Sequence, residues 1–442
     1  MKFIISKYHL LIFSILLSGA IYIRVWAAPL SAGPDVAQFW AFATIFHSHG
    51  IDFYQYADAT DGTFPFWGWG YFYPPVWILI LGLCLLAAST SQATELMVDT
   101  SWRVAMKVPI IAADAIIGCL LFWALTGPRW RRLLFAFLWL FHPTAWFESA
   151  VFGQFDAVAA AFLLASIIML EKGKNWQAFL LAGLAIMTKQ HTLMAIALMV
   201  ISVIRNIDQK LLIKFFLIFI GVIIVISIPF LLTGNFISYT KSILLSADAP
   251  GYQSHIMYAF NGIGSLLTYL HNTLGWDTEA LFQMNIPLLA ITMIAAVIFI
   301  YLKRITPVRA ALVGLCLFTA FFYRINYQYL LIYIPLALLI AGSTTYWSER
   351  IVAVGLAMVP AIWVWLSNTG FWFYYLKPMA LETLDMFEKI GLVRYGVPDY
   401  AFLALALTIM ALCLAYVLGA FLWWRRPLPV SATRTLNTER EV

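Results

Sequence analysis

Residues 205–232 read RNIDQKLLIKFFLIFIGVIIVISIPFLL, a basic cluster followed directly by an apolar run. After Lys214 the run contains no charged side chain, and it is long enough to cross a bilayer as a helix, which takes about 20 residues. Similar apolar runs recur along the chain of 442 residues, which is 63% hydrophobic and 11% charged, with a mean hydropathy of +0.87. This composition excludes an ordinary soluble domain and predicts an all-α, polytopic integral membrane protein.

The apolar segments between the basic clusters predict roughly 12 transmembrane helices. They are expected at residues 8–26, 107–126, 133–147, 152–170, 177–188, 190–204, 211–232, 284–302, 309–322, 329–345, 351–368 and 400–424. By the positive-inside rule, the basic clusters and both termini face the cytoplasm.

Two segments complicate this topology. Residues 75–88 are too short to span, and counting them would move the basic cluster 129–132 to the wrong face. We therefore expect a juxtamembrane helix inside one long outer loop, residues 27–106. Residues 177–204 would form one helix with Lys189 near its middle, and a central lysine costs about 2.5–3.5 kcal/mol on insertion. A hairpin with Lys189 at its outer turn avoids that cost.

The chain divides into three expected parts. A first transmembrane module covers residues 1–232 and includes the outer loop; residues 233–426 hold a second outer loop and the C-terminal helices; residues 427–442 form a cytoplasmic tail. The four cysteines lie dispersed in apolar segments, without metal or redox spacing. The net charge of +6 resides in inner loops, where membrane orientation explains it, so no nucleic-acid partner is expected.

Two charged residues interrupt the apolar segments near the N-terminal half. Arg24 lies within the first segment, which favours an uncleaved helix over a signal peptide. Asp114 lies about two turns into a predicted span, and we expect it to pair with Lys107 or Arg103.

An acid follows the first predicted span in the sequence Gly33-Pro34-Asp35. The Gly-Pro turn gives Asp35 a stiff local backbone at the water boundary. Asp35 is then well placed to act as a general base, or it caps the helix that begins near Val36, and the two roles are compatible.

The next outer junction, residues 141–156, reads FHPTAWFESAVFGQFD. Gly153 permits close backbone approach, and Gln154 and Asp156 can point the same way from an irregular turn. Ionisable groups at this depth are candidates for function. In the alternative interpretation, Asp156 caps the outgoing helix and Glu148 is solvated.

Further polar side chains reach the same face from later segments. Lys189, Gln190 and His191 come from the predicted hairpin turn, and Lys189 and His191 either act in function or neutralise the acids of the preceding junction. Arg324 lies in the junction YRINYQY at residues 323–329, which is predicted on the outer side, whereas most basic residues lie in inner loops. Its guanidinium suits a phosphate, or it snorkels to the interface. His255 either joins these groups or is an ordinary loop histidine.

Together these motifs resemble the GT-C glycosyltransferases. The likeness rests on an acid near the start of a long first outer loop, Tyr73-Pro74-Pro75, GQFD at residues 153–156, KQ at 189–190 and NYQYL at 326–330. The similar members use polyprenyl-phosphate sugars, among them the first mannosyltransferase of GPI-anchor assembly and the N-glycan glucosyltransferases. The resemblance covers most of residues 10–340. The GPI enzyme has a D-x-D pair in this loop, whereas Val36 and Ala37 follow Asp35, as in single-acid members.

The resemblance implies a GT-C-like fold and inverting transfer of a hexose, mannose or glucose, from a polyprenyl-phosphate donor to a glycan or glycolipid acceptor. Asp35 would be the general base, and Arg324, Lys189 and His255 would meet the donor phosphate. The residues expected to bind the sugar or acceptor are Gln154, Asp156, Gln190, His191, Glu148, Trp40, Tyr73 and Gln328. No metal cofactor is expected, because one carboxylate and a few cations form a poor Mg²⁺ cage.

Three alternatives remain open at this stage. A transporter or flippase of sugar-lipids also has many spans, but its polar site usually lies near the midplane between related halves. A non-catalytic membrane subunit would leave Asp35, Lys189 and Arg324 replaceable. Trp40, taken alone, fits a residue of the membrane interface. We expect the plasma membrane of a prokaryote as the location, with the site facing outward.

Overall fold

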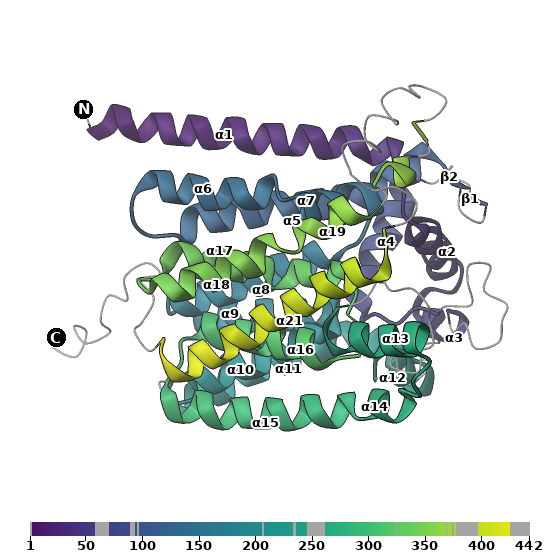
Figure 1. The fold of residues 1–442 in the computed structure, drawn as a ribbon. Helices are drawn as coiled ribbons and strands as arrows, with labels where there is room; N and C mark the ends of the chain where they lie inside the picture. The colour runs from purple at the N-terminus through teal and green to yellow at the C-terminus, as the bar shows by residue number, and fades with distance from the viewer. Residues whose placement is uncertain are drawn as a thin grey trace.

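The computed structural model describes the chain as a bundle of helices that run mostly along one axis (Figure 1). It describes residues 2–57, 70–88, 93–94, 97–205, 207–232, 236–244, 261–323, 325–367, 369–373, 375–376 and 397–424. Within these ranges β1 (Ala93–Thr94) and β2 (Met97–Val98) form one short antiparallel pair, and helices dominate. The all-α prediction is confirmed.

Six helical segments are long and apolar enough to cross a membrane. They comprise α1 (Lys2–Ala27), α5 (Thr100–Ala124), α11 (Gln209–Leu231), α14 (Glu279–Gln283) with α15 (Asn285–Lys303), α18 (Trp347–Met358) with α19 (Ala361–Leu366), and α21 (Asp399–Leu422). Their outer faces expose large apolar side chains, such as Leu217, Val225 and Ile291. Lipid can cover such faces, and water cannot do so without cost. The chain is therefore an integral, multi-pass membrane protein.

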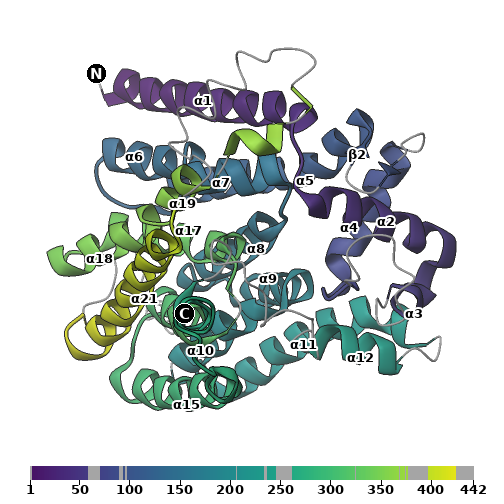
Figure 2. The same ribbon diagram turned by 45° about the vertical axis from the view of Figure 1, so that its right-hand side comes forward.

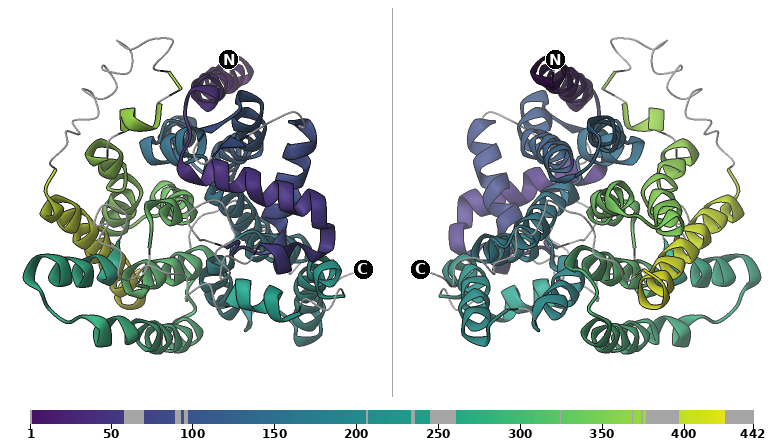
Figure 3. Two further views of the ribbon diagram at one scale, coloured as in Figure 1. Left: turned by 90° about the vertical axis from the view of Figure 1, so that its right-hand side faces the viewer. Right: turned by 90° about the vertical axis from the view of Figure 1, so that its left-hand side faces the viewer.

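Shorter helices complete the bundle. They are α6 (Arg129–Leu140), α7 (Pro143–Trp146), α8 (Asp156–Glu171), α9 (Asn175–Thr188), α10 (Leu193–Val203), α16 (Pro307–Phe321) and α17 (Ile334–Ser343). α16 and α17 are buried along nearly their whole length, whereas α1 lies at the periphery in the end-on views of Figure 3. Each predicted span falls on one of these helices or on a consecutive pair.

The segment 177–204 is broken at its lysine, as predicted. α9 ends at Thr188, Lys189 is extended, and η5 (Gln190–Thr192) leads into α10. α9 packs back against α8 after the turn at residues 172–174, and the Ser166 hydroxyl donates to the Ala178 carbonyl between them at 2.8 Å. Lys189 therefore returns to the end of the bundle where α8 begins.

The short elements gather at the end of the bundle where α1 finishes (Figures 1 and 2). They are η1 (Ala28–Leu30), α2 (Pro34–His49), η2 (Gly50–Asp52), α3 (Phe53–Tyr56), α4 (Pro75–Ala87), α12 (Phe236–Leu244), α13 (Gly262–Leu274) and η9 (Thr369–Phe373). α4 corresponds to the predicted juxtamembrane helix and packs against α2 and α5. α5 begins at Thr100, so the predicted outer loop of residues 27–106 is too long at its end. Arg103 and Lys107 fit inside α5 because carbonyl oxygens bind their polar ends.

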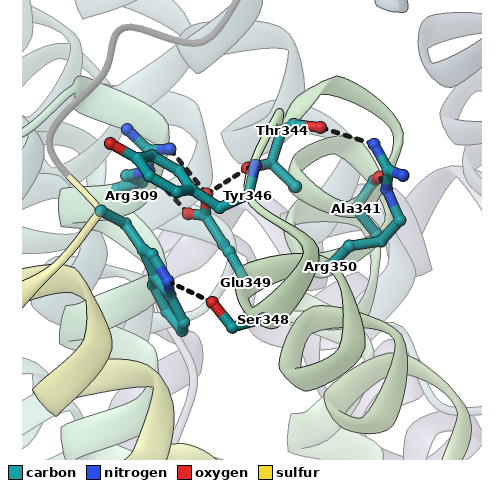
Figure 4. Close-up of polar contacts among 8 residues, drawn as sticks. Arg309, Ala341, Thr344, Tyr346, Ser348, Glu349 and Arg350 are labelled. Atoms are coloured by element: carbon teal, nitrogen blue, oxygen red, sulfur yellow. Dashed lines mark hydrogen bonds and ion pairs between the residues drawn. The ribbon is translucent and has the colours of Figure 1, made fainter.

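The opposite end of the bundle carries a buried polar cluster, shown in Figure 4. Arg309, in the first turn of α16, donates through Nε and Nη2 to the two carboxylate oxygens of Glu349 in α18, each at 2.6 Å. Thr344 donates its hydroxyl to the same carboxylate, and Trp424, just after α21, donates to Ser348 Oγ at 3.0 Å. A bidentate, fully hydrogen-bonded pair is the geometry in which a buried ion pair is tolerated, so the cluster fastens α16, α18 and the end of α21 together.

A second buried pair corrects one expectation from the sequence. Asp114 accepts from Nε of Arg24 at 2.8 Å, and Arg24 also donates to the Leu140 carbonyl at 2.7 Å. The predicted pairing of Asp114 with Lys107 or Arg103 is wrong. Both of those cations bind oxygens of the segment before α2 instead, while Arg24 lies across from Asp114 between α1, α5 and α6.

Candidate active site

The segment that leads into α2 (residues 28–36) approaches the junction between α7 and α8 (residues 147–156) at Gly33. The Gly33 amide donates to the Phe152 carbonyl at 3.0 Å, and a Cβ on Gly33 would lie 2.7 Å from that oxygen. Gly33 is also the N-cap residue of α2, with Pro34 following it. Asp35 therefore stands in the first turn of α2, and the capping position predicted as an alternative belongs to Gly33.

The second segment places an amide against this acid. A π-helical turn, η4 (Phe147–Phe152), ends at Gly153, whose φ of +87° is left-handed and whose added Cβ would lie 2.7 Å from Val36 Cγ2. Gln154 follows directly, and its Nε2 donates to Asp35 Oδ2. Two glycines at a close crossing thus bring the Gly-Pro-Asp and Gly-Gln-Phe-Asp motifs together.

The lysine and the second acid form a buried ion pair in an aromatic surround. Lys189 Nζ lies 2.6 Å from Asp156 Oδ2, and both side chains are at most 1% exposed. The ring centroids of Phe155, Tyr329 and Tyr73 lie 4.5, 4.8 and 5.1 Å from the same Nζ. Lys189 therefore pairs with Asp156, one of the two acids that the sequence offered as its partners. Phe155 is the N-cap residue of α8, so the alternative that Asp156 caps this helix is not what the structure has.

Glu148 is buried within η4, so the alternative interpretation in which it is solvated is wrong. Burial raises the pKa of the Glu148 carboxyl well above its usual range, and the nearby charges of Asp156 and Asp35 raise it further, against a smaller opposing effect of Lys189. Three acids and one lysine therefore interact at this end of the bundle. Their charges cannot all persist together in a dry site, which favours a protonated Glu148.

The remaining predicted sugar-binding residues lie around this group. Gln190 donates through Nε2 to the Phe72 carbonyl at 2.8 Å, which ties η5 to the residue before Tyr73. His191 stacks on Phe318 with a centroid distance of 5.3 Å and lies 4.7 Å from the Tyr329 ring. Trp40 is half-buried in α2, and Gln328 is buried in η8 (Tyr327–Ile332), which packs against α8.

Two predicted phosphate ligands, Arg324 and His255, lie outside the described residues. Ile325 is described, and the Asn261 backbone amide donates to its carbonyl at 2.9 Å. That contact links the segment before α13 to the junction between α16 and η8.

Sequence reasoning missed two aromatic residues that surround the lysine. Phe155 and Tyr329 were inside quoted motifs, GQFD and NYQYL, yet neither was singled out, because each also reads as an ordinary core aromatic. Lys107 was considered there as a partner of Asp114, whereas its Nζ contacts the segments that carry Asp35 and Gln154.

The model of glycosyltransferase family 87 matches residues 71–325, more than half of the chain. The chain belongs to glycosyltransferase family 87. Family 87 is of the GT-C type, so the GT-C resemblance is confirmed and the chain is a membrane glycosyltransferase, not a transporter. The matched range includes Tyr73, Gln154, Asp156 and Lys189, and Asp35 precedes it.

One solved structure is also similar to this family 87 chain. It is ArnT from Cupriavidus metallidurans in the apo state, with 13% identity and a TM-score of 0.39 over 91% of this chain and 77% of that chain. A comparison with curated proteins gives no significant match.

Proposed function

We propose that this family 87 enzyme is an inverting hexosyltransferase that moves mannose or glucose from a polyprenyl-phosphate donor to a glycan or glycolipid acceptor. One observation supports it above all: the Asp35–Gln154 hydrogen bond lies at the same end of the bundle as the buried Lys189–Asp156 pair. Phe39, one turn after Asp35 in α2, packs against Tyr73 and against Phe155, the residue before Asp156, with ring centroids 6.5 and 5.8 Å apart.

Asp35 is the proposed general base. The acceptor hydroxyl loses its proton as its oxygen attacks the anomeric carbon, and a carboxylate within hydrogen-bond reach accepts that proton. The Gln154 amide donates to Oδ2 and so fixes the plane of the carboxylate. Attack from the face opposite the phosphate inverts the sugar configuration.

The phosphate leaving group needs positive charge, and Lys189 is the described candidate. Its amine is already held by Asp156 and faced by three aromatic rings, so it is oriented before the donor arrives. Arg324 and His255 are the further proposed cations. These groups suffice for a metal-independent transfer, which is the reaction we propose.

The sugar and acceptor would lie against the polar and aromatic groups near this pair. Glu148, Gln190 and His191 supply hydrogen-bonding groups, and Trp40 and Tyr73 supply rings that can cover a sugar face. Gln328 completes this set from η8. The lipid tail of the donor remains in the bilayer, which accounts for an enzyme embedded there.

The proposed orientation places this site on the outer or lumenal side. Basic residues at helix ends, among them Arg129, Lys172 and Arg309, lie at the opposite end of the bundle, and the positive-inside rule assigns that end to the cytoplasm. The plasma membrane of a prokaryote is the proposed location.

The test is release of polyprenyl phosphate by purified protein in nanodiscs, with polyprenyl-phosphate mannose or glucose as donor. Asp35→Asn should slow release by at least about 100-fold while donor binding is retained, because the amide cannot accept the proton. EDTA should leave the wild-type rate unchanged. Equal rates for Asp35→Asn and wild type would remove Asp35 as the base, and loss of activity in EDTA would require a metal.

A further inference from the structure

Lys107 of α5 is a buried cation whose ammonium binds the two segments that form the site. Its Nζ donates to the carbonyl oxygens of Ser31 at 2.7 Å, Val151 at 3.0 Å and Ala28 at 3.2 Å, and it lies 3.3 Å from Ser31 Oγ. Its side chain is fully buried. All four of these oxygens are uncharged, so hydrogen bonds to dipoles compensate the ammonium here.

These acceptors stand immediately before the groups that do the proposed chemistry. Ser31 lies four residues before Asp35, and Val151 lies three residues before Gln154. The two segments also contact each other directly, since Ser31 Oγ lies 3.4 Å from the Ala150 carbonyl. Lys107 therefore binds both of the segments that cross where Asp35 and Gln154 meet.

Neighbouring side chains of α5 hold the same segment. Trp102 Nε1 donates to the Val36 carbonyl at 2.8 Å, and Arg103 Nε donates to the Pro29 carbonyl at 2.9 Å. These contacts reach the first segment, on either side of Asp35. Lys107 differs from them because one amine reaches both segments.

A lysine in this position carries an energetic cost that needs a reason. Removing an ammonium from water is unfavourable, and an apolar residue would fill the same space without that cost. The irregular backbone around residues 28–31 and 151 leaves carbonyls outside regular helix bonding, and an amine with three N–H groups satisfies several of them at once. The lysine thus holds residues 28–31 at a fixed distance from residue 151, because one amine binds carbonyls of both segments.

We propose that Lys107 is a positioning residue for the transfer reaction, acting by holding residues 28–36 against residues 150–156 so that the Gln154 amide meets Asp35. The proposal rests on the proposed function for its catalytic consequence. Its structural content, the clamp between two segments, stands independently of the donor.

Hydrogen–deuterium exchange in nanodiscs tests the clamp without any substrate. Lys107→Met should raise deuterium uptake in peptides covering residues 28–36 and 150–156 and leave residues 175–188 of α9 as in wild type. Ile117→Ala, a buried change further along α5, is the matched control for general destabilisation and should leave the local pattern unchanged. Uptake by Lys107→Met equal to wild type, or raised uniformly, would overturn the clamp. Lys107→Gln keeps N–H donors on a shorter side chain and replaces the Met variant if that variant does not fold.

Kinetics then test the positioning role. Lys107→Met should lower kcat by about 10- to 100-fold, because small misplacement of a reacting group has effects of this size, with KM for the polyprenyl-phosphate sugar changed less than about twofold. In a Gln154→Ala background the same substitution should add little, because the Asp35 contact it protects is already gone. Multiplicative losses, or a fall in kcat no greater than that of Ile117→Ala, would overturn the role. If wild type releases polyprenyl phosphate from neither donor, the proposed function fails, and the exchange result for the clamp still stands.

Discussion

The buried Lys189–Asp156 pair gives a quantitative expectation for stability. Lys189→Met would leave the Asp156 carboxylate without its cation at a place where neither side chain is more than 1% exposed. Breaking a buried pair by removing one partner costs about 3–5 kcal/mol. That cost is roughly two to three and a half powers of ten in the equilibrium between folded and unfolded protein.

The double variant Lys189→Met with Asp156→Leu distinguishes the cost of one unpaired buried charge from the cost of losing both charges. With both charges gone, the new apolar side chains can pack against Phe155 and Tyr329, and stability should return to within about 1 kcal/mol of wild type. The free energy of unfolding is measured by denaturant titration of the helical circular dichroism signal in mixed micelles. Both single variants and the double variant should lose transferase activity, because each lacks the oriented ammonium.

The Arg309–Glu349 pair at the other end of the bundle is the matched control. Arg309→Met should be similarly destabilised, and Arg309→Met with Glu349→Leu should recover, but here the folded fraction should keep wild-type kcat. A loss of less than about 1 kcal/mol in Lys189→Met would show that Asp156 does not depend on Lys189 for its burial, since removing one partner of a buried ion pair is strongly destabilising. An active double variant at residues 156 and 189 would refute the phosphate-binding role.

Glu148, Gly153 and Arg24 each give a further prediction. Because burial raises the folded-state pKa of Glu148, stability should be greatest at low pH and fall as the pH rises from about 4.3 upward, and Glu148→Gln should flatten this slope in melting curves taken across pH. Gly153→Ala should cost about 1–3 kcal/mol and lower the transfer rate, because its φ is +87° and its Cβ would meet Val36; melting and polyprenyl phosphate release measure the two effects. Arg24→Met should destabilise by about 3–5 kcal/mol by stranding Asp114, and Arg24→Met with Asp114→Leu should recover most of the loss in the same denaturant titration.

The long helices were predictable because an apolar run that crosses a bilayer must match its thickness. The break at Lys189 was predictable for a similar reason, since a central lysine is costly and an interrupted helix avoids the cost. The sharing of one face by Asp35, Gln154 and Asp156 followed from topology alone.

The partners within that face were not predictable. Hydropathy does not say which helices are neighbours, so Asp114 was assigned to cations of its own helix when its partner came from α1. The contact between Asp35 and Gln154 depends on a π-helical turn and on two glycines at a crossing, and neither leaves a periodic signal. Whether Glu148 is solvated or takes part in the site was left open by the sequence, because its burial depends on the packing of η4.

The Arg24–Asp114 pair bears on how the chain is inserted during synthesis. Arg24 enters the membrane in the last turn of the first helix before its partner Asp114 exists, because Asp114 is made 90 residues later, in the next long helix. A charge in the membrane is unfavourable without such a partner. The first helix is therefore expected to remain beside the translocon until α5 has been made. The two helices then enter the lipid together as a hairpin. Nascent chains stalled before residue 114 should remain extractable at alkaline pH, and chains stalled well after it should resist extraction.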